Sequence, residues 1–259
     1  WMFNSNNILR LNTGTGYRIV NVFTEDHAAL TGSREVVLED DLAPEQSYNA
    51  NINFNKSIVT KSKKYIGIDI TAFYTYFTNR IIADYDQNPN QIYYANLESY
   101  AVSQGISLNL DLNIVRNLKM NIGATLMDIA SFDNGERKQQ ILTENFSGTW
   151  SASYDIPKLK LSIDYTGNVY SPMRLPILSD LDPRPEYSPW WSIQNIQFTY
   201  KGLQSFEFYG GVKNLLNWTP TKNTPFIIAR SNDPFDKNVQ FDADGKAITT
   251  ADNPYGLTF

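Results

Sequence analysis

The residues with the most chemical potential lie in two short segments near the start of the chain, GTGYR (14–18) and TEDHAAL (24–30). Together they supply an aromatic ring, a guanidinium, two carboxylates and an imidazole. Such a mixture can orient a compact polar ligand through a few convergent hydrogen bonds beside an aromatic face. The alternative is that these groups order the loop by hydrogen bonds. The predicted substrate-binding residues are Tyr17, Arg18, Glu25, Asp26 and His27.

A metal site is not expected from these residues. His27 is the single histidine, and the chain has no cysteine. Adjacent residues on an extended chain point to opposite sides, which argues against a three-ligand site built from Glu25, Asp26 and His27 alone. DADG (242–245) resembles the start of a calcium loop but lacks the spaced acids and the terminal Glu of that loop. We therefore predict no metal and no cofactor.

Catalysis is not expected either. GTG (14–16) has neither the third glycine nor the following helix of a dinucleotide-binding fingerprint, and no Gly-x-Ser-x-Gly elbow occurs. One histidine gives little support for a catalytic triad. The enzyme alternative is an outer-membrane phospholipase-type barrel, which would need a Ser or Asn beside His27 on the barrel wall.

The elements that must position these residues are β-strands. In GISLNLDLNI (105–114) aliphatic residues alternate with Ser, Asn and Asp without a break, which is the period of a strand with one polar and one apolar face. The segment 146–155 and the segment 158–169 show the same pattern. Further strands are predicted near 7–14, 48–59, 65–77, 118–127, 190–200 and 205–214, so about nine strands are expected.

Short and long connections alternate along the chain. Tight breaks are expected at 59–64, 115–118, 155–158 and 201–204. This asymmetry predicts an all-β, antiparallel up-and-down barrel that spans a membrane, with tight turns on one side and long extracellular loops on the other. The chain, 1–259, would be part of one barrel domain. The predicted long loops are 15–44, 78–91, 128–144, 170–189 and 214–259.

Length and composition agree with a membrane barrel. Strands of roughly 11–13 residues, tilted near 40°, would rise about 30 Å, which is enough to cross the hydrocarbon layer. The mean hydropathy of -0.38 fits a barrel whose lumen face is polar. The net charge of -5 and the absence of a Lys/Arg cluster argue against nucleic acid as a partner.

Three stretches resemble the C-terminal part of TonB-dependent outer-membrane receptors. They are GTGYR (14–18), DLAPEQSYNANINF (41–54) and GGVKNLLN (210–217). Two further stretches, TEDHAALTGSREV (24–36) and DPRPEYSPWWSIQNIQ (182–197), are similar to the Bacteroidetes variety of this family. We expect the chain to be part of a larger protein.

The resemblance implies a barrel of 22 strands around an N-terminal plug that this chain does not contain. It implies uptake of a scarce nutrient, such as a siderophore, another metal chelate or cobalamin. The expected partners are the TonB–ExbB–ExbD complex, engaged through an N-terminal segment outside this chain, outer-membrane lipid, the substrate, and a surface lipoprotein. A passive porin and a β-rich surface binding protein are the alternatives.

Overall fold

A computed structural model describes residues 2–4, 6–19, 35–39, 42–62, 64–84, 91–133, 135–176, 185–220, 226, 240–241 and 247–248. These residues are mainly β-structure. Among them, no helix has the length and apolar composition needed to cross a membrane. Glu25, Asp26, His27 and the segment 242–245 lie outside the described residues.

The strands are β1 (Met2–Asn4), β2 (Asn7–Arg18), β3 (Glu35–Leu38), β4 (Glu45–Val59), β5 (Tyr65–Phe77), β6 (Ile81–Asp84), β7 (Gln91–Asn96), β8 (Tyr100–Val115), β9 (Leu118–Asp133), β10 (Glu136–Gln139), β11 (Phe146–Ile156), β12 (Leu161–Tyr170), β13 (Trp191–Tyr200), β14 (Phe208–Val212), β15 (Gln240–Phe241) and β16 (Ala247–Ile248). A 3-10 turn, Pro157–Leu159, connects β11 to β12.

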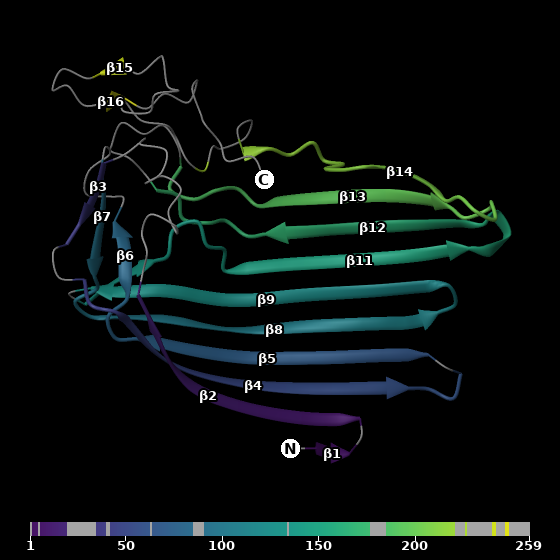
Figure 1. Cartoon of the computed structure of the whole chain (residues 1–259), viewed down its shortest axis with the longest axis horizontal. Coiled ribbons are helices and arrows are strands. Elements are labelled where there is room, and N and C mark those ends of the chain that lie inside the picture. Colours follow the sequence, from purple (N-terminus) through teal and green to yellow (C-terminus); the bar gives the residue numbers. More distant parts are fainter. Residues whose placement is uncertain are drawn as a thin grey trace.

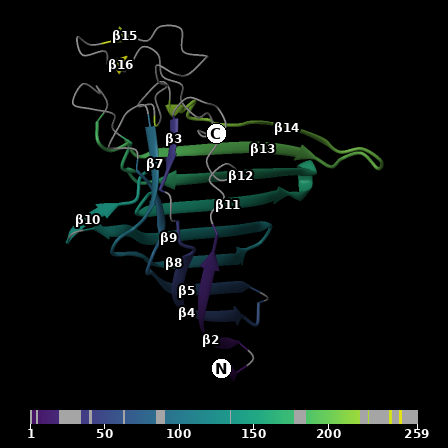
Figure 2. The ribbon, with the colours of Figure 1, turned by 60° about the vertical axis from the view of Figure 1, so that its left-hand side comes forward.

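The long strands form one antiparallel meander. The sheet has eleven strands in the order β1-β2-β4-β5-β8-β9-β11-β12-β13-β14, with β10 paired to β9. Figures 1 and 2 show this sheet with the short turns at one end and the longer connections, together with β3, β6 and β7, at the other. We call these the short-turn end and the long-connection end. The all-β, antiparallel fold predicted from the sequence is confirmed.

The alternation predicted for GISLNLDLNI is confirmed by the register of β8. Leu110 lies opposite Ile68 of β5 and Ile122 of β9, so aliphatic side chains line up across three strands. On the other side of the sheet, Asn109 lies opposite Asp69 and Gly123. The same registers extend from β2 to β13 and divide the sheet into an apolar face and a polar face.

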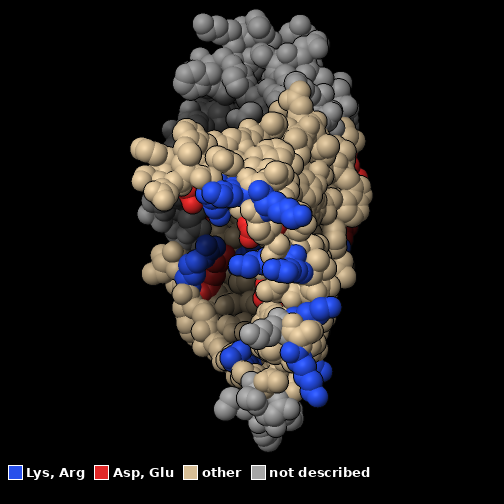
Figure 3. All heavy atoms as spheres, turned by 90° about the vertical axis from the view of Figure 1, so that its right-hand side faces the viewer, with Lys and Arg blue, Asp and Glu red and all other residues tan. Residues whose placement is uncertain are grey.

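The polar face lines a hollow. Figure 3 looks along the strands from the short-turn end and shows the sheet curled around this hollow, with acidic side chains inside it and Lys and Arg around its rim. A wet interior accommodates unpaired lone pairs of Asn, Ser and Asp at little cost. The apolar face therefore points outward.

Aromatic side chains bracket the outward apolar face. Tyr76, Tyr100 and Phe132 stack at the long-connection end, with ring centroids 5.3 and 4.6 Å apart. Tyr200 marks the short-turn end of β13, ten residues from Trp190. At about 3.3 Å per residue and a tilt near 40°, this separation is about 25 Å, the height of the apolar band of a membrane barrel.

Two sequence predictions need correction at the long-connection end. The loop predicted to begin at residue 15 begins after Arg18, because Thr15–Arg18 continue the ladder against Glu45–Tyr48. Two predicted loops also contain strands: β3 lies in 15–44 and β6 lies in 78–91. Both pair with β7, which follows the second of these loops; the β3–β7 pairing is parallel. This small sheet is held by Ile92 and Tyr94, which pack on Val36, Ile81 and Ala83.

Leu110 and Asn109 provide a test of which face meets lipid. Leu110→Arg would put a charge between Ile68 and Ile122, and we expect it to lower the free energy of unfolding by about 2–4 kcal/mol if position 110 lies near the bilayer midplane. Asn109→Arg enters the wet face and should cost well under half of that. Urea unfolding of the full-length protein in lipid vesicles measures both; equal losses would contradict the assignment of the faces.

Candidate functional site

The polar face carries a hydrogen-bonded network across β2, β4 and β5. Asn53 is its centre: it accepts from Arg10 (3.3 Å) and donates to Asp69 (3.0 Å) and to Thr71 (2.8 Å). Asn55 donates to the second oxygen of the same Asp69 carboxylate (3.3 Å). Alternating strand residues bring these groups to one side, and the register aligns them into rows.

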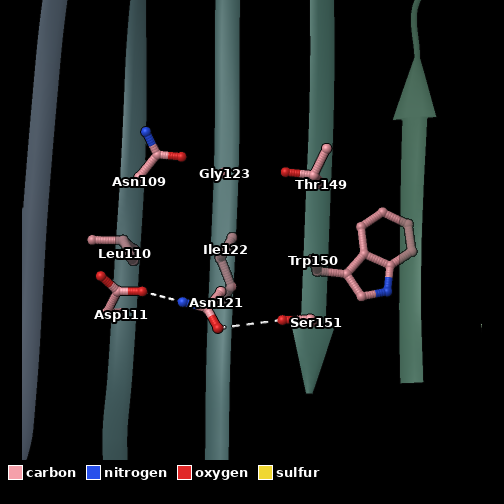
Figure 4. A pocket seen from close by; sticks show the side chains of 9 residues that line it. All are labelled: Asn109, Leu110, Asp111, Asn121, Ile122, Gly123, Thr149, Trp150 and Ser151. Atoms are coloured by element: carbon pink, nitrogen blue, oxygen red, sulfur yellow. Dashed lines mark hydrogen bonds between the residues drawn. The ribbon is translucent and has the colours of Figure 1, made fainter. Parts of the chain in front are cut away.

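A shallow pocket, smaller than the interior hollow described above, lies on the polar face at β8, β9 and β11. It encloses about 240 Å³, and Figure 4 shows a row of side chains along its edge. Asn121 donates to Asp111 and accepts from Ser151 (3.3 Å). Gly123 lies between Asn109 and Thr149, and a Cβ there would come within 2.7 Å of the Thr149 hydroxyl oxygen. Its oxygens and amides suit ligand hydroxyl and N–H groups.

At the long-connection end, a buried carboxylate joins three elements. Arg18 Nε, at the end of β2, donates to Glu45 Oε2 at 2.6 Å, and the Ile81 N–H of β6 donates to Glu45 Oε1 at 2.9 Å. The Glu45 side chain is 6% exposed, whereas the Arg18 side chain is 56% exposed. Arg80 lies nearby: burial lowers the pKa of its guanidinium, Glu45 opposes that shift and Arg18 adds to it.

Two asparagines fasten the surrounding connections. Asn79 accepts from the Gln46 N–H (2.9 Å) and donates to the Pro44 carbonyl (2.6 Å). Asn96 makes two bonds with the backbone of Ala43, at 2.7 and 3.0 Å. The segment that precedes β4 is therefore tied to the β5–β8 connection by bonds to Ala43, Pro44 and Gln46.

The structure separates two of the predicted substrate-binding residues. Arg18 lies on the polar face opposite Glu45, and its neighbour Tyr17 lies on the apolar face, where it is 72% exposed. Tyr17 therefore joins the outward aromatic residues at this end of the sheet. Glu25, Asp26 and His27 lie outside the described residues, so their part in the site stays a prediction.

An aromatic cluster on the polar side was not predicted. Tyr170 stacks on Trp191 at 4.2 Å, and Trp191 stacks on Trp218 at 5.0 Å. Buried Met173 and Leu175 pack in the same cluster. The available signal was the doublet WW (190–191), because adjacent strand residues face opposite sides and one of the two must face inward.

The described residues contain no group of side chains suited to a metal ion. Within the described part of the chain, no three His, Cys, Asp or Glu side chains are grouped as a metal ion requires. The polar face carries hydrogen-bonding groups along the strands and aromatic rings at the long-connection end. Such a surface can bind a ligand and guide it.

Comparison with protein families gives one match. Residues 1–215 match the family described as TonB dependent receptor-like, beta-barrel. This match covers more than half of the chain. None of the curated proteins compared with the chain matches it significantly.

Several solved structures share the fold at low identity. The siderophore receptor PirA from Acinetobacter baumannii is 16% identical, with a TM-score of 0.58; 83% of this chain and 35% of that chain are covered. The FrpB iron transporter from Neisseria meningitidis is 14% identical, with a TM-score of 0.60 and coverages of 84% and 34%. The ferric-catecholate import receptor Fiu from E. coli K12 is 12% identical, with a TM-score of 0.60 and coverages of 98% and 32%. The chain thus spans about a third of the length of each structure.

Glu45→Gln tests the role of the buried carboxylate. The substitution removes the negative charge that faces Arg18 and Arg80 but keeps an oxygen for the Ile81 N–H. We expect the free energy of unfolding to fall by about 1–2 kcal/mol. Amide hydrogen exchange across β6 should also accelerate, because its anchor to β4 is weakened.

Glu39→Gln is the matched control, since Glu39 is an exposed carboxylate at the same end of the sheet. It should change neither measurement. Equal effects of the two substitutions would show that the loss of one negative charge, and not the contacts of Glu45, accounts for the change in stability.

Proposed function

Because the chain belongs to the TonB-dependent receptor family, we propose that it forms part of the barrel wall of a receptor that imports a scarce nutrient. The β-barrels of this family reside in the bacterial outer membrane. In this proposal residues 1–259 belong to one barrel domain, and the long connections face the cell exterior. Transport is driven by the TonB–ExbB–ExbD complex, which engages a segment outside this chain.

The two-faced sheet carries the proposal. A predominantly apolar face, bracketed by aromatic residues, fits a lipid bilayer, and a polar face fits a wet interior through which a polar solute moves. A soluble surface protein with this sheet would need a second layer to cover residues such as Leu11 (71% exposed) and Leu126 (57% exposed).

We propose a compact metal chelate, such as a ferric siderophore, as the substrate class, with cobalamin as the alternative. The similar structures include a siderophore receptor and a ferric-catecholate import receptor, which supports this class. Amide, hydroxyl and carboxylate groups along the wall suit the polar periphery of a chelate. The aromatic cluster at Tyr170, Trp191 and Trp218 suits ring-bearing ligands.

Substrate contacts are proposed at the long-connection end, above the polar face. Arg18 is the described member of this site, because its side chain is more than half exposed although it is held by Glu45. Glu25, Asp26 and His27 follow it in the chain and complete the proposed set. Tyr17 is assigned to the membrane interface instead, because it lies on the opposite face.

Uptake with and without TonB tests this function. The full-length receptor is expressed in a host that lacks its own siderophore receptors, and uptake is measured with labelled ferric catecholates, ferric hydroxamates and cobalamin. We expect one class to enter only when TonB is present. Uptake that persists without TonB would identify a passive channel, and binding without any uptake would identify a surface binding protein.

Arg18→Ala and Tyr17→Ala form a matched pair in this assay. Arg18→Ala should weaken binding of the imported compound at least tenfold, since a charge-assisted hydrogen bond is worth about 1.5–3 kcal/mol. Tyr17→Ala should leave the affinity unchanged. Loss of binding through Tyr17 alone would contradict the assignment of these two residues.

Thiol labelling tests the orientation. Residues 1–259 contain no cysteine, and the receptor without an added cysteine serves as the background control. Lys138→Cys lies in β10 at the long-connection end, and Lys158→Cys lies in the 3-10 turn at the short-turn end. A membrane-impermeant maleimide applied to intact cells should label position 138 but reach position 158 only after lysis. The reverse pattern would invert the topology.

A further inference from the structure

Charge is distributed unevenly between the two ends of the molecule. The segments that hold the long strands and short turns are 7–18, 45–77, 100–133, 146–170 and 191–212. Eight of the 27 acidic residues lie in them: Glu45, Asp69, Asp111, Asp128, Asp133, Asp155, Asp164 and Glu207. Eleven of the 22 basic residues do: Arg10, Arg18, Lys56, Lys61, Lys63, Lys64, Arg116, Lys119, Lys158, Lys160 and Lys201. A protein of net charge -5 thus has a positively charged strand and turn region.

Most of this positive charge lies at the short-turn end. The four short turns are 60–64, 116–117, 157–160 and 201–207, and Glu207 is their single acidic residue. Figure 3 shows Lys and Arg side chains distributed around this end of the sheet. We define the basic rim as the exposed basic side chains of these turns: Lys61, Lys64, Arg116, Lys158, Lys160 and Lys201.

Part of the basic rim is interleaved with exposed apolar side chains. Leu159 lies between two lysines and is 61% exposed, and Phe206, in the neighbouring turn, is 68% exposed. The two turns are joined, because the Lys201 N–H donates to the Lys160 carbonyl at 2.8 Å. Lys160 Nζ also donates to the Gly202 carbonyl at 3.4 Å.

Tyr200 adds an aromatic ring to the same surface. A Cβ at Gly202 would lie 2.0 Å from the Tyr200 hydroxyl oxygen, so the ring lies directly over the backbone of the second turn. Tyr200 also belongs to the apolar face that meets lipid, where it lies opposite Leu161. The lysines and exposed apolar residues of these turns are therefore continuous with the lipid-facing surface.

This combination matches an anionic phospholipid leaflet. Lysines interact with the phosphates, while Leu159 and Phe206 reach the boundary between headgroups and acyl chains. An acidic soluble partner would account for the lysines but not for apolar side chains exposed between them at the edge of the apolar band. We propose that turns 157–160 and 201–207 bind anionic phospholipid headgroups in the periplasmic leaflet of the outer membrane.

Lipid binding by the purified full-length receptor tests the proposal. Native mass spectrometry of receptor released from mixed micelles counts the bound phosphatidylglycerol and phosphatidylcholine of identical acyl chains. The wild type should retain phosphatidylglycerol preferentially. Since each lysine near an anionic surface contributes roughly fivefold in affinity, the triple variant K158Q/K160Q/K201Q should lose at least tenfold in phosphatidylglycerol affinity, with phosphatidylcholine unchanged.

The control variant R137Q/K138Q/R174Q makes the same change of charge at the long-connection end and should retain the wild-type preference. Lys→Arg at the three turn positions should also retain it, which separates charge from misfolding. Equal retention of both lipids by the wild type, or equal losses in the two triple variants, would overturn the proposal. The assay requires no transport, so the proposed uptake function can fail independently.

Discussion

The structure depends on one constraint: backbone hydrogen bonds cannot be left unmade in a hydrocarbon layer. No water is present there to replace them, and each unmade bond costs several kcal/mol. The ladder therefore runs from strand to strand, with thirteen register pairs between β4 and β5 and ten between β11 and β12. Strands as long as β8, with 16 residues, follow from the thickness to be crossed.

The two faces follow from this ladder, because a strand bound on both sides can direct its side chains only above and below the sheet. Departures from the pattern occur where they are least costly. Asp128 lies on the apolar face, but near the stacked ring of Phe132 at the long-connection end, and it is paired with Arg137. A charge close to the membrane interface costs far less than one at the midplane. On the polar face, by contrast, polar side chains bond to one another: Asn53 donates a hydrogen bond to Asp69 of the neighbouring strand.

The candidate site combines the polar face of the sheet with connections that are hydrogen-bonded to it. Glu45 is the clearest case, because a carboxylate that is almost fully buried links β2 and β6 and keeps an exposed guanidinium in place. The proposed site is thereby preorganised at its base, and its remaining groups are proposed to come from the long connection after β2. The two ends of the sheet are proposed to have different roles, the long-connection end in substrate capture and the basic rim in lipid binding.

The sequence by itself determined the period of the strands, the alternation of short and long connections and hence the barrel class, because these properties reside in neighbouring residues. It also identified Arg18 as a residue of interest. Its partner Glu45, the inward direction of Trp191 and the outward direction of Tyr17 were decided by the tertiary structure. Each of these depends on the register between strands distant in the chain, and a shift of one residue would reverse every side chain. The pairing of β3 with β7 likewise joins segments more than 50 residues apart, which no local pattern records.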